Sequence, residues 1–323
     1  MTQALDFIEV EPNGNPYFCD YYSCLVDEVP LPPGMDPEAP RRPIEDSIIE
    51  ALDGPMGLVD VRPCKGIPQY DQSVALWSHY SSDRALFELS YGGNRGAVPH
   101  LQSQGYVAHE AMKALRRAIP SHRVGRFDVA LDMVGEGVYE WISDELHKLH
   151  RSRGLKAKTI NHDVPDMGRS HYLGSRQSVA MVRLYEKGKK ERNDGKPYIQ
   201  HHVRLELEIK PQKQADRRRW ASVGLEEAWA ASGWTRALAK RVLSLDVQRI
   251  RRAPPMKRTD LEALQGILDQ HVKLFHRLDE EEVVAMVRAM YSHGKGGLRK
   301  KRSDEEAEEL HRNRSQAAGA TVQ

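Results

Sequence analysis

A tyrosine and an arginine stand two residues apart in an otherwise apolar stretch, SVAMVRLYEKGKK, at 178–190. Alternate side chains of a strand point to opposite faces, so Ala180, Val182 and Leu184 share one face and Arg183 and Tyr185 the other. A phenol can act as a nucleophile, and a guanidinium holds phosphate. The pattern indicates phosphate chemistry, although packing in a strand is the simpler role for a tyrosine.

Two further predicted strands also have one apolar face and one polar face. RFDVALDM (126–133) sets two aspartates opposite an apolar face, and HVRLELEIK (202–210) sets Arg204 and two glutamates opposite another. If the three strands share a sheet, its polar face collects Asp128, Asp132, Arg183, Tyr185, Arg204, Glu206 and Glu208. Such oxygen-rich sets suit Mg²⁺ or Mn²⁺, beside which a phenol could attack a phosphodiester. The alternative is an ordinary solvated face with cross-strand Arg–Glu pairs.

The elements expected around these strands define the fold. We expect a strand at 18–27, a surface loop at 28–43, a helix at 44–52, helices near 106–119 and 137–153, and mostly strands over 155–210. The prediction is an α+β fold with an open, mainly antiparallel sheet, helices packed on one face, and a smaller helical region after it. The predicted domains are a catalytic nicking domain at 1–215, a helical region for DNA binding or dimer contacts at 216–295, and a charged, disordered tail at 296–323.

Composition limits the class of protein. The chain has 323 residues, a net charge of +2 and three cysteines with no CxxC pair, which favours reduced thiols in a cytoplasmic protein. No apolar run approaches a membrane span, so no membrane partner is expected. Basic tracts, KGKKER at 187–192 and RRRW at 217–220, suit DNA phosphates. The DNA-binding residues that we predict are Arg176, Lys187, Lys189, Lys190, Arg217, Arg218 and Arg219.

Three segments together resemble one family. They are RFDVALD at 126–132, YLGSRQSVAMVRLYEKG at 172–188 and VRLELE at 203–208, in matching order and spacing. This set is similar to the replication initiation factor family, the Rep_trans-type rolling-circle initiators of plasmids and filamentous phages. The similarity covers roughly residues 18–245, and 172–188 is its most specific part.

The resemblance implies a metal-dependent endonuclease that nicks one strand of a double-strand origin. Tyr185 would take the 5′ phosphate as a phosphotyrosine and leave a free 3′ hydroxyl, with Arg183 and Arg204 beside it. Mg²⁺ or Mn²⁺ would be held by Asp128, Asp132 and Glu186, with Glu206 and Glu208 as further ligands, and Asp20 or Asp27 could contribute.

The implied partners are origin DNA, double-stranded and as the displaced single strand, a host helicase and polymerase, and a second copy of the chain. The main alternative is a non-catalytic DNA-binding protein of the same descent that binds an origin or operator. A phosphohydrolase acting on small molecules is a weaker one, because the basic tracts suit it less.

Overall fold

The computed structural model describes residues 6–7, 16–30, 43–79, 81, 83–93, 98–160, 167–250 and a few positions between 281 and 288. Contacts between Cα atoms divide the chain into two compact units, Met1–Ala253 and Pro254–Gln323. The sheet and its helices lie in the first unit. The predicted tail at 296–323 lies outside the described residues, as does most of 254–295.

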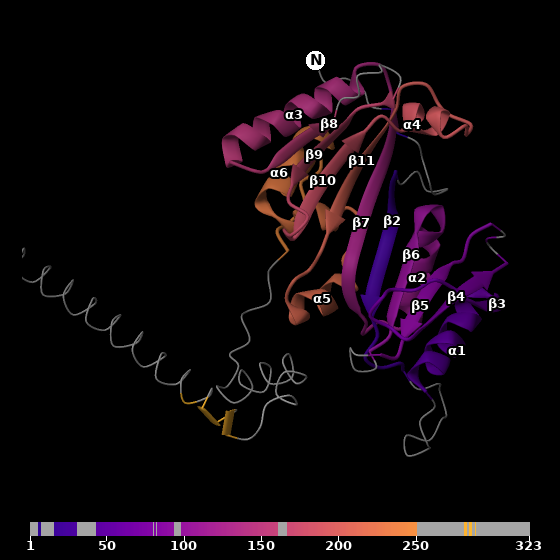
Figure 1. The fold of residues 1–323 in the computed structure, drawn as a ribbon. Coiled ribbons are helices and arrows are strands. Elements are labelled where there is room, and N and C mark those ends of the chain that lie inside the picture. The colour runs from indigo at the N-terminus through magenta and orange to yellow at the C-terminus, as the bar shows by residue number, and fades with distance from the viewer. Residues whose placement is uncertain are drawn as a thin grey trace, which may run out of the picture. The chain divides into compact units, whose positions relative to one another are not determined.

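One antiparallel sheet organises this unit (Figure 1). In the part of the chain that the structure describes it has 11 strands in the order β3-β4-β5-β6-β2-β7-β11-β10-β9-β8, and β1 also pairs with β7. The strands are β1 (Asp6–Phe7), β2 (Tyr17–Leu25), β3 (Leu58–Pro63), β4 (Gln72–Ser78), β5 (Phe87–Tyr91), β6 (His100–Gln104), β7 (Arg123–Val134), β8 (Ala157–Ile160), β9 (Ser170–Gly174), β10 (Ala180–Tyr185) and β11 (His202–Ile209).

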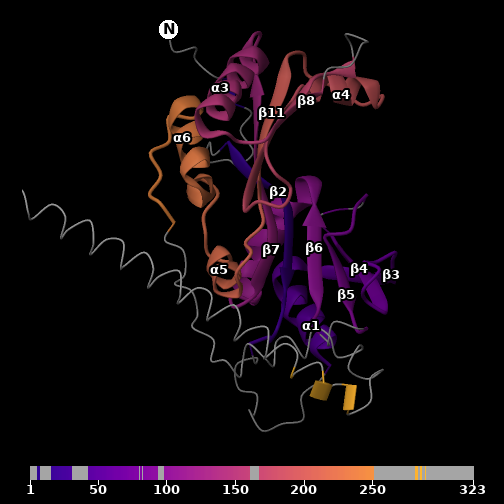
Figure 2. The ribbon, with the colours of Figure 1, turned by 60° about the vertical axis from the view of Figure 1, so that its left-hand side comes forward.

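Helices pack against the apolar side of this sheet. They are α1 (Ile44–Met56), α2 (Ala108–Ala118), α3 (Val138–Arg153), α5 (Gln214–Trp220) and α6 (Gly233–Val242), with the short 3₁₀ helices η1 (Gly105–Val107) and η3 (Glu227–Ala231). Figure 2 shows α3, α5 and α6 on one side and α4 (Lys187–Asn193) on the other. The predicted α+β fold with an antiparallel sheet is confirmed, and α4 departs from the predicted placing of all helices on one face. None of the helices described is both long and apolar enough to cross a membrane.

The predicted apolar faces form the core. Phe127, Val129 and Leu131 of β7 are fully buried, as are Val182 of β10 and Leu205 of β11. They belong to one cluster that also takes in apolar residues of α1, α2, α3 and α6. Alternation along the strands therefore assigned the core side correctly.

The helical segment after β11 belongs to the same unit. Trp220 of α5, Trp229 of η3 and Leu238 of α6 are buried in the cluster that covers the sheet. The boundary predicted at 215/216 lies inside the compact unit, because these apolar side chains are buried against the sheet and not in a core of their own. Strands β3 and β4 were not predicted from the sequence; the residues of β3 are mostly exposed and carry no apolar alternation.

Candidate active site

The sheet brings the three polar strand faces together. β11 lies between β7 and β10, so all three predicted segments are direct neighbours. The register sets Tyr185 opposite Arg204, and Arg204 opposite Asp132 on the next strand. Arg183 is likewise opposite Glu206. Asp132 and Arg204, 72 positions apart in the chain, thus share one small area of the sheet.

This polar face is buried. Asp128 is 0% exposed, Glu206 3% and Asp132 6%. Taking a carboxylate out of water costs several kcal/mol unless ion pairs and hydrogen bonds compensate. The alternative of a solvated face with ordinary surface pairs is therefore wrong for these acids.

Arginines compensate for the buried acids. Nη2 of Arg183 lies 2.9 Å from Asp128 Oδ2 and also contacts Glu206. Arg126 donates from Nε to Asp128 Oδ1 at 2.8 Å, and its Nη2 lies 3.0 Å from Glu208 Oε2. The acids and guanidiniums form one connected network across three strands.

Arg204 joins a second part of the network. It donates to both Asp132 oxygens and, through Nη1, to Asp20 Oδ1 at 2.8 Å. Burial alone would raise the pKa of Asp132, but hydrogen bonds from Arg204 and His202 hold it well below its usual value. Lys187, from α4, adds a third basic contact at 2.8 Å.

A β-bulge brings Asp20 to this face. The pairing of β2 with β7 shifts between Cys19 and Tyr21, so that Asp20 is the extra residue. A bulge re-aims side chains locally, and here it lets Asp20 reach Arg204 while Cys19 stays in the core. The sequence analysis named Asp20 only as an open alternative to Asp27, which lies elsewhere, paired with Arg123.

Tyr185 lines an open cavity of about 570 Å³ together with acids and bases of the network. The cavity lining includes Asp20, Asp128, Arg183, Glu206 and Lys190. Burial raises the pKa of Tyr185 well above its usual value, and the positive charge of Arg204 opposes the rise. Lys190 Nζ lies 5.7 Å from the centre of the tyrosine ring. The hydroxyl is thus a neutral phenol at pH 7, with two cations close to it.

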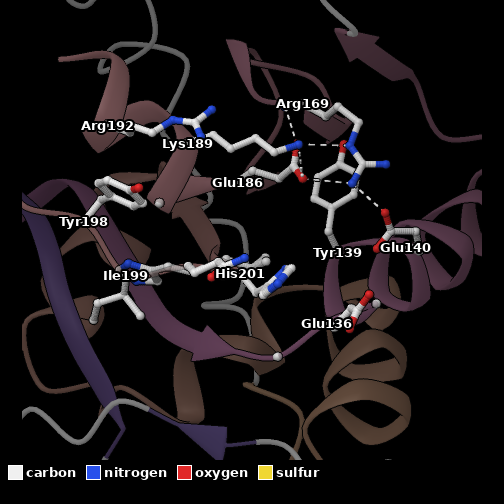
Figure 3. A pocket seen from close by; sticks show the side chains of 16 residues that line it. Glu136, Tyr139, Glu140, Arg169, Glu186, Lys189, Arg192, Tyr198, Ile199 and His201 are labelled. Carbon is white, nitrogen blue, oxygen red and sulfur yellow. Dashed lines mark hydrogen bonds and ion pairs between the residues drawn. The ribbon is translucent and has the colours of Figure 1, made fainter. Parts of the chain in front are cut away.

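Glu186 turns to a different set of partners. Its carboxylate accepts from the Arg169 backbone at 2.8 Å and from the Arg169 side chain, and it pairs with Lys189 at 3.0 Å, as Figure 3 shows. Burial would raise its pKa, but Arg169 and Lys189 lower it to about 2. Glu186 therefore lines the same cavity as Tyr185, yet its ion pairs are with Arg169 and Lys189 instead of the arginines of the sheet.

The carboxylates differ in how well they could hold a divalent ion. Asp132, Glu186 and Glu208 are each committed to two or more basic side chains. Asp128 is likewise held by Arg126 and Arg183, but burial raises its pKa. Glu206 meets Arg183, and burial and the neighbouring carboxylate raise its pKa to about 8. Burial therefore disfavours the charged form of both carboxyls, and a divalent cation beside them would favour their ionised form.

These carboxylates therefore suit a divalent ion that takes few of its ligands from the protein. In the described ranges no group of three His, Cys, Asp or Glu residues is arranged to hold a metal ion. Mg²⁺ commonly takes one or two carboxylates and fills its other positions with water and substrate phosphate oxygens. Asp128 and Glu206 satisfy that requirement, and Asp20 stands near enough to Glu206 to raise its pKa further.

The predicted DNA-binding residues fall into separate places. Lys190 is exposed beside Tyr185, and Lys189 lies next to it on α4. Lys187 is half-buried on Asp132. Arg176 is exposed at the β9–β10 turn, at the opposite end of β10 from Tyr185. The tract Arg217, Arg218 and Arg219 lies on α5, whose Trp220 is buried against Phe127 on the apolar side of the sheet.

Two residues of the site were missed from the sequence. Arg126 carries the same parity as Asp128 and could have been found by extending the alternation by one position. Arg169 lies before β9 and meets Glu186 only because β9 and β10 are paired. Nothing in the local sequence marks it.

Comparisons with known proteins find matches among solved structures. No protein-family model and no curated protein matches the chain. Among solved structures, a rolling circle replication initiator protein from Geobacillus stearothermophilus superposes with a TM-score of 0.46 and 18% identity, over 72% of this chain and 99% of that one.

Proposed function

We propose that this chain is a rolling-circle replication initiator that nicks one strand of its origin with Tyr185. The observation that carries the proposal is the shared cavity: Tyr185 opens onto the space lined by Asp128, Glu206 and Arg183. The resemblance of 126–132, 172–188 and 203–208 to the initiator family points to the same residues.

The reaction is one transesterification. The Tyr185 oxygen bonds to phosphorus, the bond from phosphorus to the 3′ oxygen breaks, and the phenol proton leaves as the 3′ oxygen gains one. The products are a 5′-phosphotyrosine and a free 3′ hydroxyl that a polymerase can extend. Because one phosphate ester replaces another and no water is consumed, the reverse reaction can rejoin the strand.

The chain's own groups have distinct roles in this step. The charge of Arg204 favours the phenolate of Tyr185, against which burial acts. Arg183 and the exposed Lys190 supply positive charge for the phosphate. A divalent ion held by Asp128 and Glu206 would supply Lewis-acid polarisation of the phosphate oxygen. Asp132 acts as a positioning residue, since it holds Arg204 in place.

The test is a nicking assay on supercoiled plasmids that carry the DNA surrounding this protein's own gene, with Mg²⁺ or Mn²⁺. We expect open circles with protein attached to the 5′ end. Tyr185→Phe should abolish both products and leave DNA binding intact. Tyr172→Phe, on the neighbouring strand β9, is a matched control for the loss of one hydroxyl from this cavity.

The results also separate the alternative. If Tyr185→Phe nicks as well as the wild type, the nucleophile is another group. If the wild type binds one region of that DNA tightly but never nicks it with either metal, the protein is a non-catalytic origin- or operator-binding protein.

A further inference from the structure

A second cavity of about 320 Å³ adjoins the one that holds Tyr185. We call it the side cavity. It lies between the start of α3, helix α4 and the loop that leads into β11, and it shares Arg169 and Glu186 with the Tyr185 cavity. Because Glu186 lines both cavities and directly follows Tyr185 in the chain, the two cavities share a wall close to Tyr185.

Aromatic rings stand on two sides of this space. Figure 3 shows Tyr139, next to Arg169, on one side and Tyr198 on the other. Tyr198 is 51% exposed, and the guanidinium of Arg192 lies 5.8 Å from its ring centre. Ile199, also about half exposed, adds an apolar surface beside it. Exposed aromatic rings with a nearby arginine are the usual stacking surface for unpaired bases.

The charges around the side cavity balance. Its lining has three carboxylates, of Glu136, Glu140 and Glu186, and three cations, of Arg169, Lys189 and Arg192. Arg169 pairs with both Glu140 and Glu186, and so the charge is largely neutralised within the wall. A neutral ring suits this space better than a phosphate group does.

A tyrosine hydroxyl in the wall has no hydrogen-bond partner among the described residues. Tyr139 is only 5% exposed, and its buried hydroxyl makes no hydrogen bond to any described residue. A buried hydroxyl without a partner costs about 1–3 kcal/mol, so such groups in native proteins commonly meet water or a ligand. Nucleobase edges carry donors and acceptors that could satisfy it.

We propose that the side cavity binds one unpaired nucleobase of the strand that Tyr185 cuts. Tyr198 supplies the stacking surface, and the Tyr139 hydroxyl bonds to the edge of the base. This inference rests on the proposed nicking function for the identity of the strand. The consequence is that the nucleotide next to the nick is held unstacked, which fixes the scissile phosphate at Tyr185.

The binding test uses Tyr185→Phe protein, so that no strand is cut. The probes are a fluorescent oligothymidylate and an abasic oligomer of the same length. One stacked base is worth about 1–3 kcal/mol, so the parent should bind the thymidylate about tenfold more tightly or better. Adding Tyr198→Ala should remove most of that preference. Adding Tyr198→Phe should keep it, and so should adding Tyr106→Ala, which removes a 60% exposed tyrosine elsewhere.

A second variant separates binding from folding. Tyr139→Phe removes a hydroxyl that makes no hydrogen bond to the part of the chain that the structure describes, so the melting temperature of the variant should equal or exceed that of the parent. Its affinity for oligonucleotides should fall several-fold, by different factors for oligothymidylate and oligodeoxyadenylate. A variant that melts lower and binds normally would mean that the hydroxyl has a structural role only.

Two outcomes overturn the inference while leaving nicking untouched. One is full preference for bases in the Tyr198→Ala protein. The other is displacement of the oligonucleotide by free thymidine at equal concentration, which would make the side cavity a site for a free nucleoside. Because these are binding measurements, they decide the matter even if the wild type never nicks DNA, which is the result that would refute the proposed function.

Discussion

Arg204 holds Asp132 through two parallel hydrogen bonds, Nε to Oδ1 at 2.6 Å and Nη2 to Oδ2 at 2.7 Å, from directly opposite positions on β11 and β7. The same guanidinium lies opposite Tyr185 on β10. These two hydrogen bonds therefore fix the cation that lies opposite the proposed nucleophile.

Breaking this pair should destabilise the protein strongly. Arg204→Met leaves Asp132 buried, with only Lys187 and His202 beside it, and removing one partner of a buried pair costs about 3–5 kcal/mol. Arg204→Lys should lower the free energy of unfolding by less, because lysine keeps the positive charge and loses only the two parallel hydrogen bonds of the guanidinium. Urea unfolding measures both. Lys113→Ala, which breaks the exposed pair with Glu110, is the control and should change the free energy of unfolding by less than about 1 kcal/mol. If Arg204→Met lowered the free energy of unfolding by less than about 1 kcal/mol, as the control should, the role assigned to Arg204 would be wrong.

Glu206→Gln should separate stability from metal binding. Burial and Asp128 raise the pKa of Glu206 to about 8, so the carboxyl is largely protonated at pH 7 and a neutral amide replaces it with little loss, within about 1 kcal/mol. The ion would lose a ligand, however. We expect Mn²⁺ to raise the melting temperature of the wild type and not that of the variant. Equal shifts in both proteins would remove Glu206 from the metal site.

Two buried histidines should lower the free energy of unfolding in mild acid. Burial lowers the pKa of His122 and of His171 to about 4. In the unfolded chain both titrate near 6.5, so between pH 6.5 and 4 the unfolded state binds more protons and the free energy of unfolding falls as the pH falls. Each histidine contributes about 3 kcal/mol over that window.

Melting curves across pH 4–7 measure this effect. The His122→Phe and His171→Phe variants should each show a flatter pH dependence than the wild type, whatever their stability at pH 7. A dependence as steep as that of the wild type in both would show that neither histidine is held neutral.

Gly188 allows α4 to approach the loop before β11. A Cβ there would lie 2.1 Å from the carbonyl oxygen of Ile199, so Gly188→Ala must push α4 away from that loop. We expect a lower melting temperature and weaker oligonucleotide binding, because Lys189, Lys190 and Arg192 move with α4. Gly233→Ala in α6, where the new Cβ meets no atom within 4 Å beyond its chain neighbours and the helix's own backbone, is the control and should not lower the melting temperature. An unchanged melting temperature of Gly188→Ala would mean that α4 can move away from the loop without loss of stability.

Alternation along three strands was enough to divide core from polar face. Because side chains in a strand repeat every two residues, Val129, Val182 and Leu205 were assigned to the core, and Asp128, Arg183 and Glu206 to the same opposite face, before any neighbour was known. The family-like motif also set Gly188 two residues after Glu186, and the close approach of α4 to Ile199 is a physical reason for it.

Other features of the site depend on register and on contacts distant in sequence. Asp20 reaches Arg204 through a bulge, and Arg169 meets Glu186 through the β9–β10 pairing, neither of which is marked locally. Burial raises the pKa of Asp128 and of Glu206, whereas hydrogen bonds from Arg204 hold the pKa of Asp132 low, and these environments follow from which groups each acid meets in the fold. Local sequence determines which way a side chain points from its strand, whereas only the folded chain decides what stands opposite it.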